Sequence, residues 1–194
     1  MKQKPEEILK GLDYGHIYTT DVNHILEIHN TAKNHAKGRA LELGSYLGHS
    51  TLAIAMAGLD VVVYDTDTSV EDKRKALLKD YKVEWNNAPS SEALNERRYF
   101  EFIFHDSDHG DGMIPEMVRL FNERLLKGGT MMIHDAELLT ILNLLGQLEP
   151  HEHRSSWDGR DGKCSPSSRN YDPENLYFLP RCRCRQGLHQ RGTL

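Results

Sequence analysis

The chain has 194 residues, a length typical of one domain, and its 24 Lys and Arg against 29 Asp and Glu make it mildly acidic. This balance argues against a general nucleic-acid-binding surface, and no stretch reaches the ~20 apolar residues of a membrane span. The charged segment Met1–Leu12 is unlike a secretion signal, and three cysteines, all after residue 163, do not form a disulfide framework. We therefore expect a cytoplasmic protein that contacts neither a membrane nor nucleic acid.

Two helices are predicted ahead of the first strand. Pro5 begins a short helix, which is followed by a polar and aromatic stretch that ends at Thr20. Asp21 is a good N-cap for a second helix over Val22–Ala36, whose apolar residues recur at helical spacing. We expect this helix to pack on a sheet.

Residues 40–65 predict a strand, a tight glycine turn, a helix and a second strand. The apolar runs Ala40–Leu43 and Val61–Tyr64 are the strands, and Ser50–Gly58, rich in small residues, is the helix between them. This is one βαβ unit, the repeating element of parallel sheets.

The turn after the first strand predicts a nucleoside-binding site. It reads Glu42-x-Gly44-x-x-x-Gly48, a spacing that brings backbone N–H groups and a helix N-terminus close to a ligand, and Asp65 is placed to bind ribose hydroxyls. The dinucleotide pattern G-x-G-x-x-G fails in both registers, and the carboxylate of Glu42 would repel a pyrophosphate. A cationic ligand without phosphate fits better, and S-adenosylmethionine is such a ligand.

Helices and strands continue to alternate in the next part of the chain. A charged helix is predicted over Val70–Tyr81, and short strands over Val83–Trp85 and Phe102–Phe104. An amphipathic helix over Met113–Leu126 and a strand over Thr130–Ile133 follow. The alternation predicts an α/β fold, a doubly wound and mostly parallel sheet with helices on both faces, which binds ligands outside the carboxyl ends of its strands.

Four acids fall at the predicted carboxyl ends: Glu42, Asp65, Asp106 and Asp135. Two nearby carboxylates in a partly dry cleft need a neutralising partner, and a hard divalent cation such as Mg²⁺ or Ca²⁺ is the usual one. Asp106 and Asp135 each also stand where a helix N-cap would be.

Four segments together resemble the class I S-adenosylmethionine-dependent methyltransferases, in their small-molecule O-methyltransferase branch. They are ALELGSYLGHST (motif I), Val61–Asp65 (the second motif), FEFIFHDSDHG (the fourth-strand motif) and LLKGGTMMIHDAE (the fifth-strand motif, with Lys127 where proline is common). The resemblance covers roughly Asp21 to Gly146.

The resemblance implies roles for individual residues. Cofactor contacts would come from Glu42, Gly44, Ser45, Gly48, Ser50, Asp65, Asn87 and Asp106. The family's strand order makes the fourth and fifth strands neighbours, so that Asp106 and Asp135 would face each other and hold the metal. Ala136 stands where catechol-type members have an asparagine ligand.

A general base is implied by a second branch of the family. Sugar- and macrolide-modifying members often read D-x-D-H at the fourth strand, which Asp106-Ser107-Asp108-His109 matches. Asp106 and His109 are therefore the candidate catalytic residues, and His134 is interpreted as structural. The tetrapeptide of nucleobase amino-methylating enzymes and the Pro-Cys of cytosine-carbon enzymes are both missing here, which favours a small-molecule acceptor.

The chain is divided by composition near residue 150. Residues 1–150 are expected to form the cofactor-binding domain with an N-terminal cap, and residues 151–194 an irregular extension that completes or flanks the sheet. A helix over Leu138–Leu148 and a strand over Asn175–Leu179 are predicted around this boundary. The family normally adds a sixth strand and an antiparallel seventh, whereas only one strand is predicted here. One possibility is therefore that a second copy of the chain, in a homo-oligomer, completes the acceptor pocket. The tail also has residue types that suit zinc, at non-standard spacing: His151, His153, Cys164, Cys182 and Cys184.

The sequence thus predicts methyl transfer from S-adenosylmethionine to a hydroxyl of a small molecule by direct in-line displacement. Two alternatives stay open. One is a protein that binds S-adenosylmethionine without transferring its methyl group. The other is a metal-dependent enzyme of this fold with different chemistry.

Overall fold

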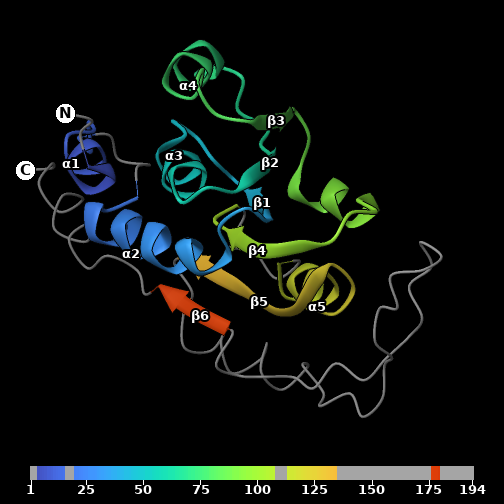
Figure 1. The fold of residues 1–194 in the computed structure, drawn as a ribbon. Coiled ribbons are helices and arrows are strands. Elements are labelled where there is room, and N and C mark those ends of the chain that lie inside the picture. The colour runs from blue at the N-terminus through green and yellow to red at the C-terminus, as the bar shows by residue number, and fades with distance from the viewer. Residues whose placement is uncertain (1–3, 16–19, 108–112, 135–175, 180–194) are drawn as a thin grey trace, which may run out of the picture.

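The computed structural model describes residues 4–15, 20–107, 113–134 and 176–179. The helices are α1 (Pro5–Lys10), α2 (Val22–Ala32), α3 (His49–Met56), α4 (Glu71–Leu77) and α5 (Met113–Glu123), with short 3₁₀ helices η1 (Lys33–His35) and η2 (Ser90–Asn95). The strands are β1 (Arg39–Leu43), β2 (Asp60–Tyr64), β3 (Val83–Asn86), β4 (Phe100–His105), β5 (Leu125–His134) and β6 (Leu176–Leu179). Figure 1 shows their arrangement.

The strands form one sheet in the order β3-β2-β1-β4-β5-β6, and every neighbouring pair is parallel. The chain starts in the middle of the sheet, builds outward to β3, returns beside β1 and continues to β6. This confirms the doubly wound parallel sheet and the pairing of the fourth and fifth strands. Since all six strands run the same way, their carboxyl ends lie along one edge, where such folds bind ligands.

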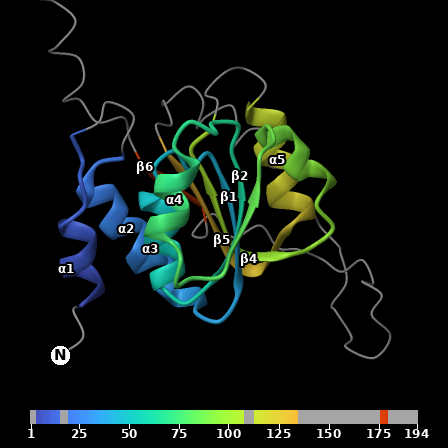
Figure 2. The same cartoon turned by 90° about the horizontal axis from the view of Figure 1, so that it is seen from above.

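Helices cover both faces of the sheet (Figures 1 and 2). On one face, α1, α2 and α3 pack over Ala40, Phe102 and Phe104, and on the other, α5 and η2 pack over Leu41 and Ile103. The inward residues alternate along each strand, as the period of two requires. The two apolar clusters hold the strand ends, and therefore the site, in place.

Element boundaries differ from the prediction where the chain leaves the sheet. The helix predicted to reach Ala36 ends at Ala32 and tightens into η1, and the charged helix ends at Leu77. The fifth strand begins at Leu125 rather than Thr130, with a register shift between Phe100 and Phe102 of its neighbour β4. The Asp21 cap is confirmed, since its carboxylate accepts the N–H of Asn23 at 2.8 Å.

The described part of the chain contains no helix that is both long and apolar enough to span a membrane. The helix predicted over residues 138–148 and the candidate zinc residues lie outside the described residues. The strand predicted over Asn175–Leu179 is present as β6, and it pairs directly with β5 in the parallel sense.

Candidate active site

The carboxyl ends of β1, β2 and β4 meet at the middle of the sheet and bring three predicted acids together. Backbone hydrogen bonds continue past the strands, with the N–H of Asp106 donating to Leu43 at 2.8 Å and that of Gly44 donating to Tyr64 at 2.9 Å. Glu42, Asp65 and Asp106 are close enough that the two aspartates raise the pKa of Glu42, although burial is the main cause of that shift.

Glu42 is the most buried of these acids, with 0% of the residue exposed. The Ser50 hydroxyl, from the first turn of α3, donates to its Oε1 at 2.5 Å, while Oε2 is also buried and has no hydrogen-bond partner among the described residues. Burial raises the pKa of Glu42 from 4.5 to about 8, against the opposing effect of the Ser50 and Thr51 hydroxyls. A buried carboxyl with an unused oxygen suits a ligand that brings a positive charge and an N–H donor.

Gly44 lies close to the backbone of the segment that follows β4. Its φ is +80°, and a Cβ built there would lie 2.3 Å from the carbonyl oxygen of Asp106 and 2.9 Å from Cα of Ser107. The turn after β1 therefore rests directly on the backbone after β4. Gly48, just before α3, packs instead against α4, where a Cβ would lie 3.1 Å from Leu78.

Asp65 holds this turn in shape. Its Oδ2 accepts the backbone N–H groups of Ser45 at 2.8 Å and Tyr46 at 2.7 Å, and the Arg74 guanidinium lies 3.1 Å from the same oxygen. Arg74 is 1% exposed and stacks over Trp85 at 4.9 Å. In this arrangement Asp65 organises the glycine turn, and its predicted contact with ribose stays a prediction.

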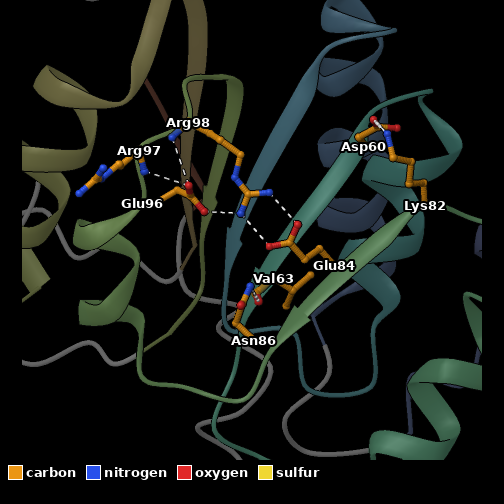
Figure 3. A network of polar contacts seen from close by, with 8 residues as sticks. All are labelled: Asp60, Val63, Lys82, Glu84, Asn86, Glu96, Arg97 and Arg98. Atoms are coloured by element: carbon orange, nitrogen blue, oxygen red, sulfur yellow. Dashed lines mark hydrogen bonds and ion pairs between the residues drawn. The ribbon is translucent and has the colours of Figure 1, made fainter.

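An open cleft of about 670 Å³ lies at the ends of β2 and β3. Tyr64, Asn86 and Asn87 line it, together with η2 residues and the segment that follows η2. Figure 3 shows how this wall is braced: Arg98 lies between Glu84 and Glu96, with 2.6 and 2.7 Å contacts to Glu84. Asn87 thus lies in a cleft at the ends of β2 and β3, and its predicted contact with the cofactor stays a prediction.

Asp106 is the centre of a second set of contacts, on the β5 side. The Thr20 hydroxyl donates to its Oδ2 at 3.1 Å, and Nδ1 of His134 lies 3.0 Å from its Oδ1. His134 in turn lies 3.1 Å from His24 of α2, between Nε2 and Nδ1. Sequence reasoning missed His24 and Thr20, and it interpreted His134 as structural although it contacts the predicted catalytic acid.

The N-terminal segment borders the turn after β1. Tyr14 donates to the Leu9 carbonyl at 2.6 Å and packs edge-on against His49, with ring centroids 5.3 Å apart. Burial raises the pKa of Tyr14 to about 12 and lowers that of His49, so both rings are uncharged at neutral pH. Tyr14 and Thr20, which both lie between α1 and α2, thus contact the two predicted motifs, at His49 of α3 and at Asp106 after β4.

Two predicted site residues, His109 and Asp135, lie outside the described residues. Among the residues that the structure describes, no group of three His, Cys, Asp or Glu side chains could hold a metal ion. His105 is buried 3.5 Å from Glu116 of α5, and it therefore faces away from Asp106.

The part of the chain that carries this site also matches a known protein family. A family model described as a methyltransferase domain matches residues 41–136, which run from β1 to just past β5. No curated protein matches the chain by sequence.

Solved structures share the fold. The SAH-bound methyltransferase PaMTH1 of Podospora anserina is 18% identical with a TM-score of 0.54, and the match covers 66% of this chain and 58% of that protein. An O-methyltransferase of Bacillus cereus, also with SAH, is 16% identical (TM-score 0.54, covering 68% and 66%). The N-methyltransferase NodS of Bradyrhizobium japonicum is 14% identical (TM-score 0.55, covering 74% and 86%). At these identities the likeness concerns the fold, and the chain spans little more than half of the first protein.

Proposed function

We propose that this chain, which has the fold of the class I S-adenosylmethionine-dependent methyltransferases and a methyltransferase domain over residues 41–136, methylates a hydroxyl of a small molecule. The observation that carries the proposal is Glu42, a fully buried carboxyl with one oxygen that no described residue satisfies, at the strand edge where this fold binds ligands. Such a group is unfavourable in an empty protein and favourable beside a cation.

The residues present fit S-adenosylmethionine. Glu42 would accept a hydrogen bond from its amino group, and the Ser45–Gly48 turn, which Asp65 holds in shape, would lie along the nucleoside. Tyr64 and Asn87 line a cleft open enough for a base. When bound, S-adenosylmethionine supplies an electrophilic methyl group on a sulfonium.

The acceptor is proposed to lie beside Asp106. The hydroxyl must lose its proton as its oxygen attacks, and Asp106 stands at the end of β4 with two hydrogen-bond partners that fix its orientation. Alignment of the two reactants would be the main contribution of the protein. His109 remains the base that the sequence predicts.

Asp106 and Asp135 are the residues predicted to hold a divalent cation, Mg²⁺ or Ca²⁺. Among the described residues no group of three His, Cys, Asp or Glu side chains could hold a metal ion here, and Thr20 donates to Oδ2 of Asp106 while His134 lies 3.0 Å from its Oδ1. Its predicted partner Asp135 lies outside the described residues. We therefore derive no step through a metal.

Calorimetry with S-adenosylmethionine tests the cofactor site. We expect binding to the wild-type protein and at least a tenfold weaker affinity in Glu42→Gln, which keeps the shape and removes the charge. Because the pKa of Glu42 is about 8 in the empty protein, a cationic ligand should draw it into its ionised form and release close to one proton at pH 7. Repeating the titration in buffers of different ionisation enthalpy measures that proton. Wild-type protein that does not bind would overturn the proposal.

Release of S-adenosylhomocysteine tests the transfer. We expect product with a phenolic, catecholic or sugar hydroxyl, and none with matched acceptors whose hydroxyl is already methylated. Binding without any turnover would select the alternative of a protein that binds but does not transfer. Product only with amine acceptors would correct the acceptor class.

A further inference from the structure

A buried arginine lies behind the glycine turn that follows β1. Arg74, on α4, is 1% exposed, and its guanidinium lies 4.9 Å from the centre of the Trp85 ring on β3. Its Nη1 lies 3.1 Å from Oδ2 of Asp65, and its Nη2 donates to the carbonyl oxygen of Asp67 at 2.6 Å. The aliphatic part of the side chain passes close to the turn itself, since a Cβ at Gly48 would lie 3.6 Å from its Cγ. Arg74 therefore lies against both the acid after β2 and the second glycine of the turn.

The carboxylate of Asp65 is largely used by the protein itself. Its Oδ2 accepts the N–H groups of Ser45 and Tyr46 and also faces Arg74. Its Oδ1 accepts the N–H of Asp67 at 2.6 Å. A carboxylate has about four acceptor positions, shared equally between its oxygens. Oδ2 is therefore fully occupied, and a ribose diol that bound to both oxygens would require the turn to give up an N–H contact.

The ion pair of Asp65 and Arg74 fits a positioning role better than a stabilising one. Taking two charges out of water is so unfavourable that an apolar pair of similar volume is often equally stable. Nε of Arg74 is also buried without a hydrogen-bond partner among the described residues, which makes the burial of this group less favourable still. What the pair does provide is a fixed acceptor at the point where two N–H groups of the turn converge.

We propose that Arg74 is a positioning residue of the cofactor site, which neutralises Asp65 and fixes its orientation. Asp65 in turn holds Ser45 and Tyr46 in the conformation along which the nucleoside lies. Asp65 thus acts on the cofactor through the turn and not by binding both ribose hydroxyls. The inference rests on the proposed function for the identity of the ligand, whereas the brace of Arg74, Asp65 and the turn is present without it.

Calorimetry with S-adenosylhomocysteine on single and double variants tests whether Arg74 acts through Asp65. We expect Arg74→Met, which keeps most of the volume and removes the charge, to weaken the affinity by roughly tenfold or more, and Asp65→Asn to do the same. In the Asp65→Asn background, Arg74→Met should have less than about a twofold further effect, because both changes act on the same turn. Lys75→Met is the matched control, since Lys75 lies on the same helix, is exposed and pairs with Glu71.

Thermal melting of the same variants separates binding from stability. The double variant should melt at a higher temperature than Arg74→Met alone, because it no longer buries an unpaired carboxylate, and yet its affinity should stay low. Arg74→Lys, which keeps the charge but not the planar fork, should show a smaller loss of affinity and serves if Arg74→Met does not fold. Wild-type affinity in Arg74→Met, or an equal loss with and without Asp65, would overturn the proposal.

Analogues of S-adenosylhomocysteine that lack one or the other ribose hydroxyl test the role of Asp65. We expect Asp65→Asn to weaken the binding of the parent compound and of both analogues by the same factor, because the turn contacts all three alike. A loss that disappears with either analogue would show that Asp65 binds that hydroxyl directly, and it would overturn the proposal.

Amide hydrogen exchange tests the brace without cofactor, which keeps it distinguishable from the proposed function. The N–H groups of Ser45 and Tyr46 should exchange slowly in the wild-type protein and much faster in Arg74→Met. The N–H of Phe100, which donates to Arg124 at the amino end of β4, should change far less. Unchanged exchange at Ser45 and Tyr46 would overturn the brace even if methyl transfer is found. Exchange that depends on Arg74 in a protein that does not bind S-adenosylhomocysteine would support the brace and remove the proposed function.

Discussion

The buried carboxyl of Glu42 is unfavourable as an ion in the empty protein, but it becomes favourable when a positively charged ligand binds beside it. The carboxyl is placed in the sheet by β1, on the face that α3 covers, where Ser50 donates to one of its oxygens and the other has no hydrogen-bond partner among the residues that the structure describes. Its neighbours Asp65 and Asp106 are also acids, which adds to the effect of burial on its pKa. The empty protein therefore keeps this group neutral near pH 7, and ionisation becomes favourable only beside a positive charge.

A stability prediction follows from the sign of that shift. The folded pKa of about 8 lies above the unfolded value near 4.5, so between these pH values the unfolded state binds fewer protons than the folded state. The free energy of unfolding should therefore fall as pH rises from about 5 to 8. In Glu42→Gln this decline should be smaller, because the amide does not ionise and its oxygen can still accept from Ser50. Thermal melting of both proteins at pH 5, 6.5 and 8 checks this. A constant difference across the series would contradict it.

Two features of Gly44 disfavour a side chain there: its left-handed backbone conformation and its contact with the Asp106 carbonyl. A pair of variants can separate the two effects. Gly44 and Gly128 have nearly the same φ, +80° and +78°, but a Cβ at Gly128 meets nothing within 4 Å, whereas one at Gly44 meets the Asp106 carbonyl at 2.3 Å. Gly128→Ala should lower the free energy of unfolding by about 1 kcal/mol through the left-handed conformation alone. Gly44→Ala should lower it by several times as much and should weaken S-adenosylmethionine binding, because the loop after β4 must move. Denaturant unfolding measures both, and equal losses would contradict the contact argument.

At the scale of elements, the site depends on where α2 begins. The Asp21 carboxylate accepts the N–H of Asn23, and one turn later His24 meets His134 of β5. The cap therefore fixes the start of the helix that brings His24 to the strand ends.

Removing the cap should have two measurable effects. Asp21→Ala should lower the free energy of unfolding by about 1 kcal/mol, since a backbone donor of the first turn loses its acceptor. Asp21→Asn, which retains an acceptor oxygen, should lose only a small part of this. Because α2 also carries His24, which contacts His134 beside Asp106, kcat should fall in the alanine variant and stay near wild type in the asparagine variant. Melting curves and product release check the pair, and a parallel loss in both variants would assign the effect to charge instead of capping.

The elements themselves were predictable where burial decides them. Strands such as β1 and β2 were found within one residue of their ends, because their apolar runs are short, continuous and bounded by glycine or acid. The start of β5 was wrong by five residues, since Leu125–Gly129 has no strand pattern and joins the sheet only by pairing with Phe100. The helix η2 carries no strong signal and was missed.

The sequence predicted the site residues that lie at the ends of strands, but not the contacts that depend on how the helices pack. Glu42, Asp65 and Asp106 were expected at one edge, and the parallel sheet places them there. The contacts of Asp106 with His134 and Thr20, and of His134 with His24, join residues 28 to 110 positions apart in the sequence, and they depend on how α2 packs beside β5. A histidine that ends a buried strand looks the same in sequence whether its ring is structural or joined to an acid. Tertiary packing makes that distinction.

At the scale of the whole molecule, the strand order places the proposed cofactor site on one half of the sheet and the proposed acceptor site on the other. The side from β1 to β3 carries Glu42, the glycine turn and the open cleft, which are the parts proposed to bind S-adenosylmethionine. The side from β4 to β6 carries Asp106, beside which the acceptor is proposed to lie, and His134, which contacts Asp106. A change at the outer edge of the second half should therefore affect transfer more than cofactor binding.

A pair of truncations tests this division. β6 pairs with Met131–His134 of β5, so a chain that ends at residue 150 exposes an unpaired strand edge directly beside His134, whereas a chain that ends at residue 181 keeps the pairing. We expect the shorter chain to melt at a lower temperature and to associate into larger species, because an open edge recruits other strands. Its affinity for S-adenosylmethionine should stay within a few-fold of wild type while product release is lost. Melting, light scattering and calorimetry on both chains check the prediction. Equal behaviour of the two truncated chains would show that β6 does not support β5, and loss of cofactor binding along with transfer would show that the two halves of the sheet do not act separately.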